Sequence, residues 1–230
     1  MRSSLLEIVR VLLERTYRMR SGLADLSPFI IGDQGFRLLY GGATLVERAD
    51  AGAGTGARTL LRATDEGLRA CIYYPDVLIR RLERFPPQRG LHEDNVDAFA
   101  DLVEELDHLL LVAERSAQRQ SVSLLELELH ANISKYLVLS RFLAGEAIRL
   151  SPGRRRWLRH HLFDKLRYRA EDREIHERYR EAARWAMRFI NRMAAIEPAE
   201  RIEALRSFHR ATFQQKVRLI RSIGQDRLGP

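Results

Sequence analysis

The sequence predicts a dominantly helical α+β protein, with an N-terminal helix and a small antiparallel β-sheet followed by an antiparallel helical bundle. Helix-capping residues followed by apolar positions three or four apart recur along most of the chain. Runs typical of strands, separated by glycine, are confined to residues 27–74. After Pro75 the segments between the predicted helices are short, which implies that neighbouring helices run antiparallel.

The first third of the chain is expected to hold one helix and the whole sheet. The helix begins at Ser4, which forms a capping box with Glu7, and ends near Gly22. Its apolar stripe consists of Leu5, Val9, Leu12 and Leu13. Strands are expected at residues 29–31, 36–40, 44–48, 59–63 and 68–74. The last two form a β-hairpin, because the Asp-Glu-Gly turn between them leaves Gly67 in a left-handed conformation.

The rest of the chain is expected to be helical. Helices are predicted at residues 76–84, from 94 or 95 to 116, at 123–144, from 152 onward, at 171–196, and from 199 to about 224. Asp76 is a candidate cap for the first of these helices, and Ser123 forms a capping box with Glu126. Ser151 precedes Pro152, which combines an N-cap with proline at the first helical position.

The length and composition fit an ordinary globular protein. The chain has 230 residues, of which 45% are hydrophobic and 30% charged, and this excludes collagen-like and wholly disordered classes. We divide it into an N-terminal helix with the sheet (residues 1–90) and a helical bundle (residues 91–230). No long polar linker separates the two, so we expect one compact body.

Cysteine usage and apolar runs indicate the compartment. The single cysteine, Cys71, excludes an internal disulfide framework and a thiolate zinc cluster. No apolar run is long enough for a transmembrane segment. Glu7, Arg10 and Glu14 interrupt what would be the apolar region of a secretion signal. We therefore expect a cytoplasmic location.

Charge is distributed unevenly along the chain. Residues 1–89 carry a net charge of +4, residues 90–150 carry −6 and residues 151–230 carry +10, for a total of +8. The acidic middle and the basic last third either neutralise each other within the fold or leave the basic part free to bind an anion. Of the 39 basic residues 36 are arginine, which most simply reflects a GC-rich coding sequence, so arginine abundance alone is weak evidence for phosphate recognition.

The glycine-rich stretch at residues 51–57 resembles a phosphate-binding loop only superficially. Phosphate loops lead into a helix whose N-terminal amides face the anion. Here Gly52, Gly54 and Gly56 precede a predicted strand, and no Lys-Ser or Lys-Thr pair follows them. We therefore interpret the stretch as a flexible hairpin loop.

Two predicted bundle helices carry a candidate metal site. Glu105 and His108 have the Glu-x-x-His spacing of carboxylate-bridged metal sites, and Glu128 and His130 lie on the next helix. In an antiparallel pair His108 and His130 would lie at the same height. Helix rotation argues against the site. The core face is expected to consist of Phe99, Leu102, Val103, Leu106, Leu109 and Leu110.

That rotation turns His108 outward. It joins a solvated acidic ridge with Asp97, Asp101 and Glu104. Glu126 is assigned to helix capping. We therefore expect an apolar bundle interior and no cofactor, and a metal-dependent bundle enzyme is only the third hypothesis.

Two groups of arginines form a candidate anion-binding or nucleic-acid-binding surface. The first group follows Pro152 and consists of Arg154, Arg155, Arg156 and Arg159. The second group recurs every four residues on a later helix and consists of Arg180, Arg184 and Arg188. A salt-bridged, solvated helix face remains the alternative for the second group, since Glu177 and Glu181 are interleaved with it.

The function hypotheses follow from these patterns. The leading one is a non-catalytic interaction or regulatory protein that acts through helical surfaces, with a protein partner or a second copy of the chain. The alternative is binding of nucleic acid or an acidic partner through the arginine-rich last third. No Gly-x-Ser-x-Gly nucleophile motif and no recognised nucleic-acid motif occur.

Overall fold

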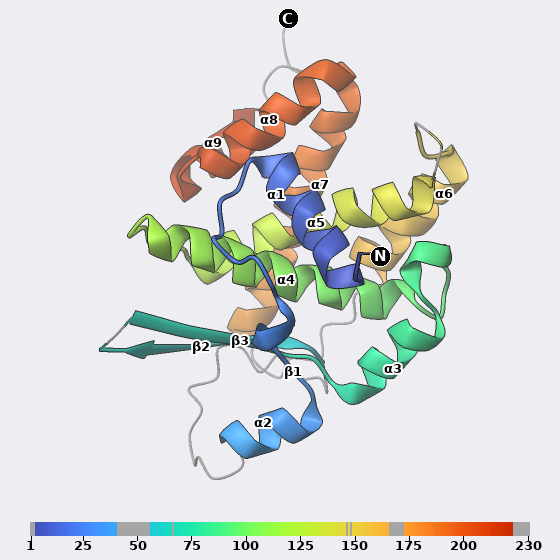
Figure 1. The fold of residues 1–230 in the computed structure, drawn as a ribbon. Coiled ribbons are helices and arrows are strands. Elements are labelled where there is room, and N and C mark those ends of the chain that lie inside the picture. The colour runs from blue at the N-terminus through green and yellow to red at the C-terminus, as the bar shows by residue number, and fades with distance from the viewer. Residues whose placement is uncertain are drawn as a thin grey trace, which may run out of the picture.

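Two long antiparallel helices, α4 (Val96–Ala117) and α5 (Leu124–Ala144), form the centre of the molecule. The structure is a computed structural model, and it describes residues 3–40, 56–65, 67–145, 147, 149–165 and 173–222. The sheet lies on one side of α4, and the last two helices lie on the opposite side of the molecule (Figure 1). The predicted fold class, a dominantly helical α+β protein, is confirmed.

Three of the predicted N-caps are confirmed. Ser4, Ser123 and Ser151 each accept a hydrogen bond from the backbone N–H three residues later, at 3.2, 3.2 and 3.3 Å. They start α1 (Leu5–Tyr17), α5 and α6 (Pro152–Arg159). A π-helical turn (His160–Asp164) continues α6. Helix α1 ends earlier than predicted, because Arg18 rather than Gly22 takes the left-handed conformation that closes it.

The sheet has three strands in the order β1-β3-β2. The predicted hairpin is confirmed as β2 (Arg58–Thr64) and β3 (Gly67–Tyr73), with Thr64 opposite Gly67 and a φ of 134° at Gly67. Strand β1 (Ile30–Ile31) pairs in parallel with β3, so the sheet is mixed and not wholly antiparallel. A 3₁₀ turn (Ser27–Phe29) leads into β1, and a second one (Pro87–Arg89) precedes α4.

The strand predicted at residues 36–40 is wrong, because this segment belongs to α2 (Asp33–Tyr40). The predicted capping role of Asp76 is also corrected. Asp76 begins α3 (Asp76–Arg84) without capping it, and its carboxylate instead accepts the N–H of Asp33 at 3.1 Å. A carboxylate distant in the sequence therefore caps α2. Its position also favours glycine at residue 32, because a Cβ there would lie 2.1 Å from the Asp76 carboxylate oxygen. The strand predicted at 44–48, with Gly52 and Gly54, lies outside the described residues.

The last predicted helix is two helices. After α7 (Arg173–Ala195) the chain forms α8 (Pro198–Arg210) and α9 (Phe213–Ser222). Ala211 is extended, with a ψ of 144°, and Thr212 and Gln215 form reciprocal capping hydrogen bonds at 2.8 and 3.4 Å. The Thr-x-x-Gln capping box starts a new helix at this point, and the sequence analysis missed it.

One hydrophobic cluster holds these elements together. It extends from α1 through α4 and α5 to α7, α8 and α9. Among the described helices, none combines the length and the apolar character needed to cross a bilayer.

Candidate metal centre

The solvated ridge expected on α4 is wrong for His108, which is buried, and for Asp101 and Glu104, which are largely covered, whereas Asp97 remains about half exposed and pairs with Lys165. The predicted core face is buried, but Asp107 and His108 are also buried, with 0% and 8% of their surface exposed. Helical periodicity alone predicted that one face of α4 is exposed to solvent, whereas the β2–β3 hairpin packs against that face (Figure 1). Thr59 of β2 donates to the Glu105 carboxylate at 2.7 Å, so the hairpin also supplies a polar partner.

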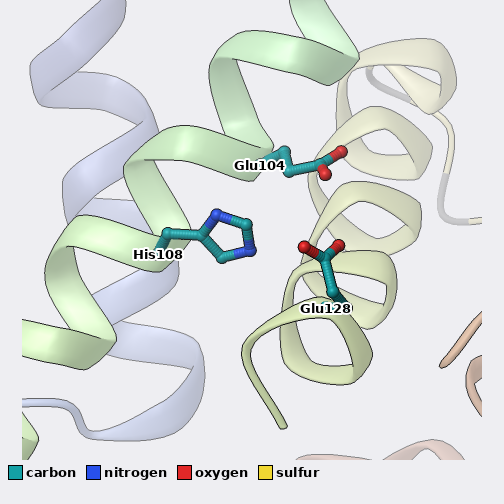
Figure 2. Close-up of side chains that lie close together, drawn as sticks. All are labelled: Glu104, His108 and Glu128. Atoms are coloured by element: carbon teal, nitrogen blue, oxygen red, sulfur yellow. The ribbon is translucent and has the colours of Figure 1, made fainter. Parts of the chain in front are cut away.

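Three side chains from α4 and α5 meet beneath this hairpin. Glu104 and His108 are four residues apart and share one face of α4, and Glu128 comes from α5. Figure 2 shows the imidazole and the two carboxylates pointing toward one another. One potential ligand atom from each lies within 4.8 Å of the other two. The buried Nε2 of His108 has no hydrogen-bond partner.

Neighbouring side chains fix the orientation and charge of the cluster. Lys135 of α5 donates a short hydrogen bond to Glu104, and Glu105 lies 3.6 Å from Nδ1 of His108. Burial opposes ionisation of Glu104, yet the Lys135 ammonium lowers the pKa of that carboxyl. Glu104 is therefore an anion at neutral pH and Lys135 is a cation.

Two other carboxyl groups and the imidazole of this region have raised pKa values. Burial, with a smaller contribution from the neighbouring Glu104 charge, raises the pKa of Glu128 to about 8. Burial likewise raises the pKa of Asp101 to about 7. Burial opposes the charged form of His108, but its interactions with Glu105 and Glu128 outweigh burial and raise its pKa to about 10.

A cavity of about 170 Å³ adjoins the three side chains. Its lining includes Thr59 and Leu61 of β2, Leu124 of α5 and Tyr179 of α7. A water molecule takes about 30 Å³ in the liquid, so the cavity has room for several waters or a small ligand.

The donor set suits a divalent metal ion. One imidazole and two carboxylates are ligands typical of Mn²⁺, Fe²⁺, Co²⁺ and Zn²⁺. Ligand atoms that share an ion at about 2.0–2.2 Å are at most about 4.4 Å apart, so the upper limit of 4.8 Å between the atoms of this cluster is close to what one shared ion requires. Three protein ligands leave at least one coordination position, which the adjoining cavity can supply with water.

The sequence-predicted metal residues divide between two clusters. His108 and Glu128 are brought together as that hypothesis required, and Glu105 lies beside His108 while it accepts from Thr59. His130 lies elsewhere, with Nδ1 2.8 Å from Asp107 and Nε2 3.0 Å from His209 of α8. The sequence analysis missed Glu104 as a candidate ligand, although its i,i+4 spacing to His108 was available as a signal.

The second cluster is a buried hydrogen-bonded chain. It runs from Asp107 through His130 and His209 to Glu114, and the last hydrogen bond, between Nε2 of His209 and the Glu114 carboxylate, is 2.7 Å long. Glu114 also accepts from the backbone of Arg20; burial opposes its ionisation, but these hydrogen bonds lower the pKa of its carboxyl. With both ends ionised, His130 donates from Nδ1 to Asp107 and His209 donates from Nε2 to Glu114, and one further proton between the two rings completes the chain.

An ion pair lies next to this chain. Lys216 of α9, with none of its surface exposed, donates a short hydrogen bond to Glu126 of α5. The Glu126 side chain therefore forms an ion pair, in addition to the capping role expected from the sequence. Arg115 lies 3.8 Å from the same carboxylate and donates to the backbone carbonyl of His209. The acidic middle and the basic last third thus meet inside the fold.

The arginines predicted to bind anions lie on two helices. In the first group Arg154 donates to the Leu143 carbonyl and Arg159 donates to Asn191 of α7. The second group is exposed, and within the described part of the chain it forms no ion pair. It consists of Arg180, Arg184 and Arg188.

No protein-family model, no curated protein and no solved structure matches this chain.

Proposed function

We propose that this protein binds one divalent transition-metal ion through Glu104, His108 and Glu128, and that the ion serves metal-dependent chemistry in the adjoining cavity. The observation that carries the proposal is the buried Nε2 of His108, which faces two carboxylates from two helices and has no hydrogen-bond partner. A buried nitrogen without a partner costs about 1–3 kcal/mol, and a metal ion would turn that cost into a bond.

The number of carboxyl groups supports a cation at this position. Asp101, Glu104, Glu105 and Glu128 line one cavity together with His108 and Arg58, and Lys135 is paired with Glu104. Without an ion, burial holds a proton on Glu128, and the neighbouring carboxylates hold one on His108. A divalent cation would replace those protons, because ligation requires an ionised carboxylate and a neutral imidazole.

The surrounding contacts are those of a supported ligand set. Glu105 beside Nδ1 would orient His108 and increase its basicity, as a carboxylate at the second ring nitrogen does for metal-bound histidine. Lys135 holds Glu104 in place from α5. Open coordination positions toward a cavity are a feature of catalytic metal sites, and a bound ion would acidify a water molecule held there.

The test is metal binding by chelator-stripped protein. Calorimetric titration with Co²⁺ and with Mn²⁺ should give one ion per chain, and Co²⁺ should produce a visible absorption band that reports nitrogen ligation. His108→Ala and the isosteric Glu128→Gln should each weaken binding at least tenfold. His160→Ala and Glu83→Gln are matched controls at exposed positions and should bind as the parent does.

Thermal melting followed by circular dichroism checks that each variant is folded. The proposal is overturned if neither ion binds saturably, or if folded His108→Ala and Glu128→Gln bind as tightly as their controls.

A second function is favoured by the exposed ridge on α7. Arg180, Arg184 and Arg188 lie on one face of the helix, and Glu181, which was expected to pair with them, forms no ion pair within the described residues. This supports interaction with an acidic partner or a nucleic acid in a cytoplasmic setting. Retention on heparin should fall steeply between low and moderate salt, and it should be lost in the triple alanine variant. Salt-independent retention would contradict this function.

A further inference from the structure

A groove of about 700 Å³ lies on the far side of α5 from the hairpin-covered cluster, bounded by α5, α7, α8 and the segment that leads into α6. Its floor is apolar and includes Ile133 of α5, Ile190 and Met193 of α7, and Leu205 of α8, all of them buried. The volume falls within the range of about 300–1,000 Å³ that is typical of small-molecule sites.

The sides of the groove carry four arginines and no carboxylate among the described lining residues. These are Arg141, Arg149, Arg155 and Arg201. Arg141 and Arg201 donate to backbone carbonyls, so both keep their full positive charge. Arg149 and Arg155 form no hydrogen bond or ion pair through their guanidinium groups within the described part of the chain.

This charge pattern differs from that of the protein as a whole. The chain has 31 acidic residues, and the deeply buried lysines are paired with them, as in Lys135–Glu104 and Lys216–Glu126. Four guanidinium groups around one apolar groove repel each other unless an anion compensates them. The combination of an apolar floor and a cationic margin matches a molecule that has both an alkyl chain and an acidic head.

We propose that this groove binds a single-chain amphiphilic anion, such as a fatty-acid carboxylate, with its alkyl chain on the floor and its head group against Arg149 and Arg155. Guanidinium groups bind carboxylates and phosphates in a bidentate manner, and these two guanidinium groups have no competing partner among the residues that the structure describes. The groove is concave and bounded by three helices, which suits a free ligand better than a flat lipid surface. Of the four arginines predicted near the start of α6, Arg155 is the one that lines it.

The test uses the full chain and dodecanoate below its micelle concentration. Calorimetry should show saturable binding of one dodecanoate per chain, and acetate should not bind because it has no alkyl chain. Dodecanol and dodecyltrimethylammonium should bind at least tenfold more weakly than dodecanoate, because neither offers an anionic head. Arg149→Gln combined with Arg155→Gln should weaken dodecanoate binding at least tenfold.

Two further variants separate this site from general attraction of anions. Arg218→Gln combined with Arg221→Gln removes the same charge from exposed positions that do not line the groove, and should leave binding unchanged. Ala194→Glu places an anion at an exposed lining position and should weaken binding at least tenfold without lowering the melting temperature.

The proposal is overturned by any one of three results. These are the absence of saturable dodecanoate binding, equal weakening by the two double-glutamine variants, and equal affinity for the cationic amphiphile. Sedimentation with phosphatidylglycerol vesicles by a protein that does not bind free dodecanoate would also overturn it in favour of a membrane surface. Because the groove lies apart from Glu104, His108 and Glu128, these outcomes are independent of the metal titration.

Discussion

Metal binding should release protons, and the structure gives their number. Without an ion, the pKa of Glu128 is about 8 and that of His108 is about 10. At pH 7 about nine-tenths of the Glu128 carboxyls and nearly all His108 imidazoles are then protonated. Lys135 keeps Glu104 ionised, so that ligand has no proton to release. Coordination of one ion should therefore release close to two protons.

Calorimetry in two buffers measures this number directly. The apparent binding enthalpy of Co²⁺ at pH 7 should change with the ionisation enthalpy of the buffer, with a slope of about two protons per ion. The association constant should rise about 100-fold from pH 6 to pH 7, since each released proton contributes about a factor of ten per pH unit. Glu128→Gln should reduce the slope to about one, whereas His160→Ala should leave it at about two.

The same pKa shifts determine whether the stability of the metal-free protein rises or falls with pH. Glu128 has a raised pKa in the folded state, so its contribution is fully present below its unfolded pKa of 4.5 and is lost as pH rises through about 8. His108, also raised, acts in the same direction up to about pH 10. The melting temperature of metal-free protein should fall from pH 6 to pH 9.

Saturable binding of Co²⁺ at pH 7 with no proton release would refute this account of the site.

Three other predictions concern what holds the structure together. Lys216→Met leaves the buried Glu126 carboxylate without its ammonium partner and should lower the free energy of unfolding by about 3 kcal/mol, with a melting temperature lower by roughly 6–12 °C. In urea unfolding, adding Glu126→Leu should restore part of the lost stability. A single Lys216→Met variant as stable as the parent would contradict a stabilising role for the pair. His209→Leu removes two of the three hydrogen bonds of the buried chain and should cost about 2–3 kcal/mol in the same assay, whereas a neutral change would mean that the chain contributes nothing. Gly32→Ala places a Cβ against Asp76 and should cost about 1–3 kcal/mol, less when Asp76→Ala is also present; additive costs would refute the clash.

Local signals in the sequence predicted the elements that depend on neighbouring residues. Serine N-caps and the turn at Gly67 act within three or four residues, and the structure has them where the pattern indicated. The start of α2 depends instead on a carboxylate 43 residues away, Asp76, which no local pattern can reveal. The break before α9 was predictable, because Thr212 and Gln215 form a capping box that is visible in the sequence.

The candidate metal centre shows where periodicity stops being informative. Helical spacing identified the core face of α4 correctly, but it could not show that a hairpin covers the opposite face. Once both faces are covered, the charged positions of α4 become interior positions. His108 was therefore placed in solvent for a reason that is sound for an isolated bundle and fails when a sheet packs on it. Its partner Glu128 was found because the antiparallel pairing of α4 with α5 follows from the short turn between them.

The rare lysines carry structural information that the abundant arginines do not. The chain has only three lysines among 39 basic residues, and two of them, Lys135 and Lys216, are buried against a single glutamate each. A buried ammonium group is compact and has three N–H donors that need partners, whereas a buried guanidinium is larger and has five. Arg115 illustrates the difference, because its buried guanidinium is shared between Gln120 and the carbonyl of His209, with Glu126 nearby. The third lysine, Lys165, is nearly half exposed and pairs with Asp97, so the interior role belongs to Lys135 and Lys216, and Lys135 forms part of the wall of the candidate metal centre.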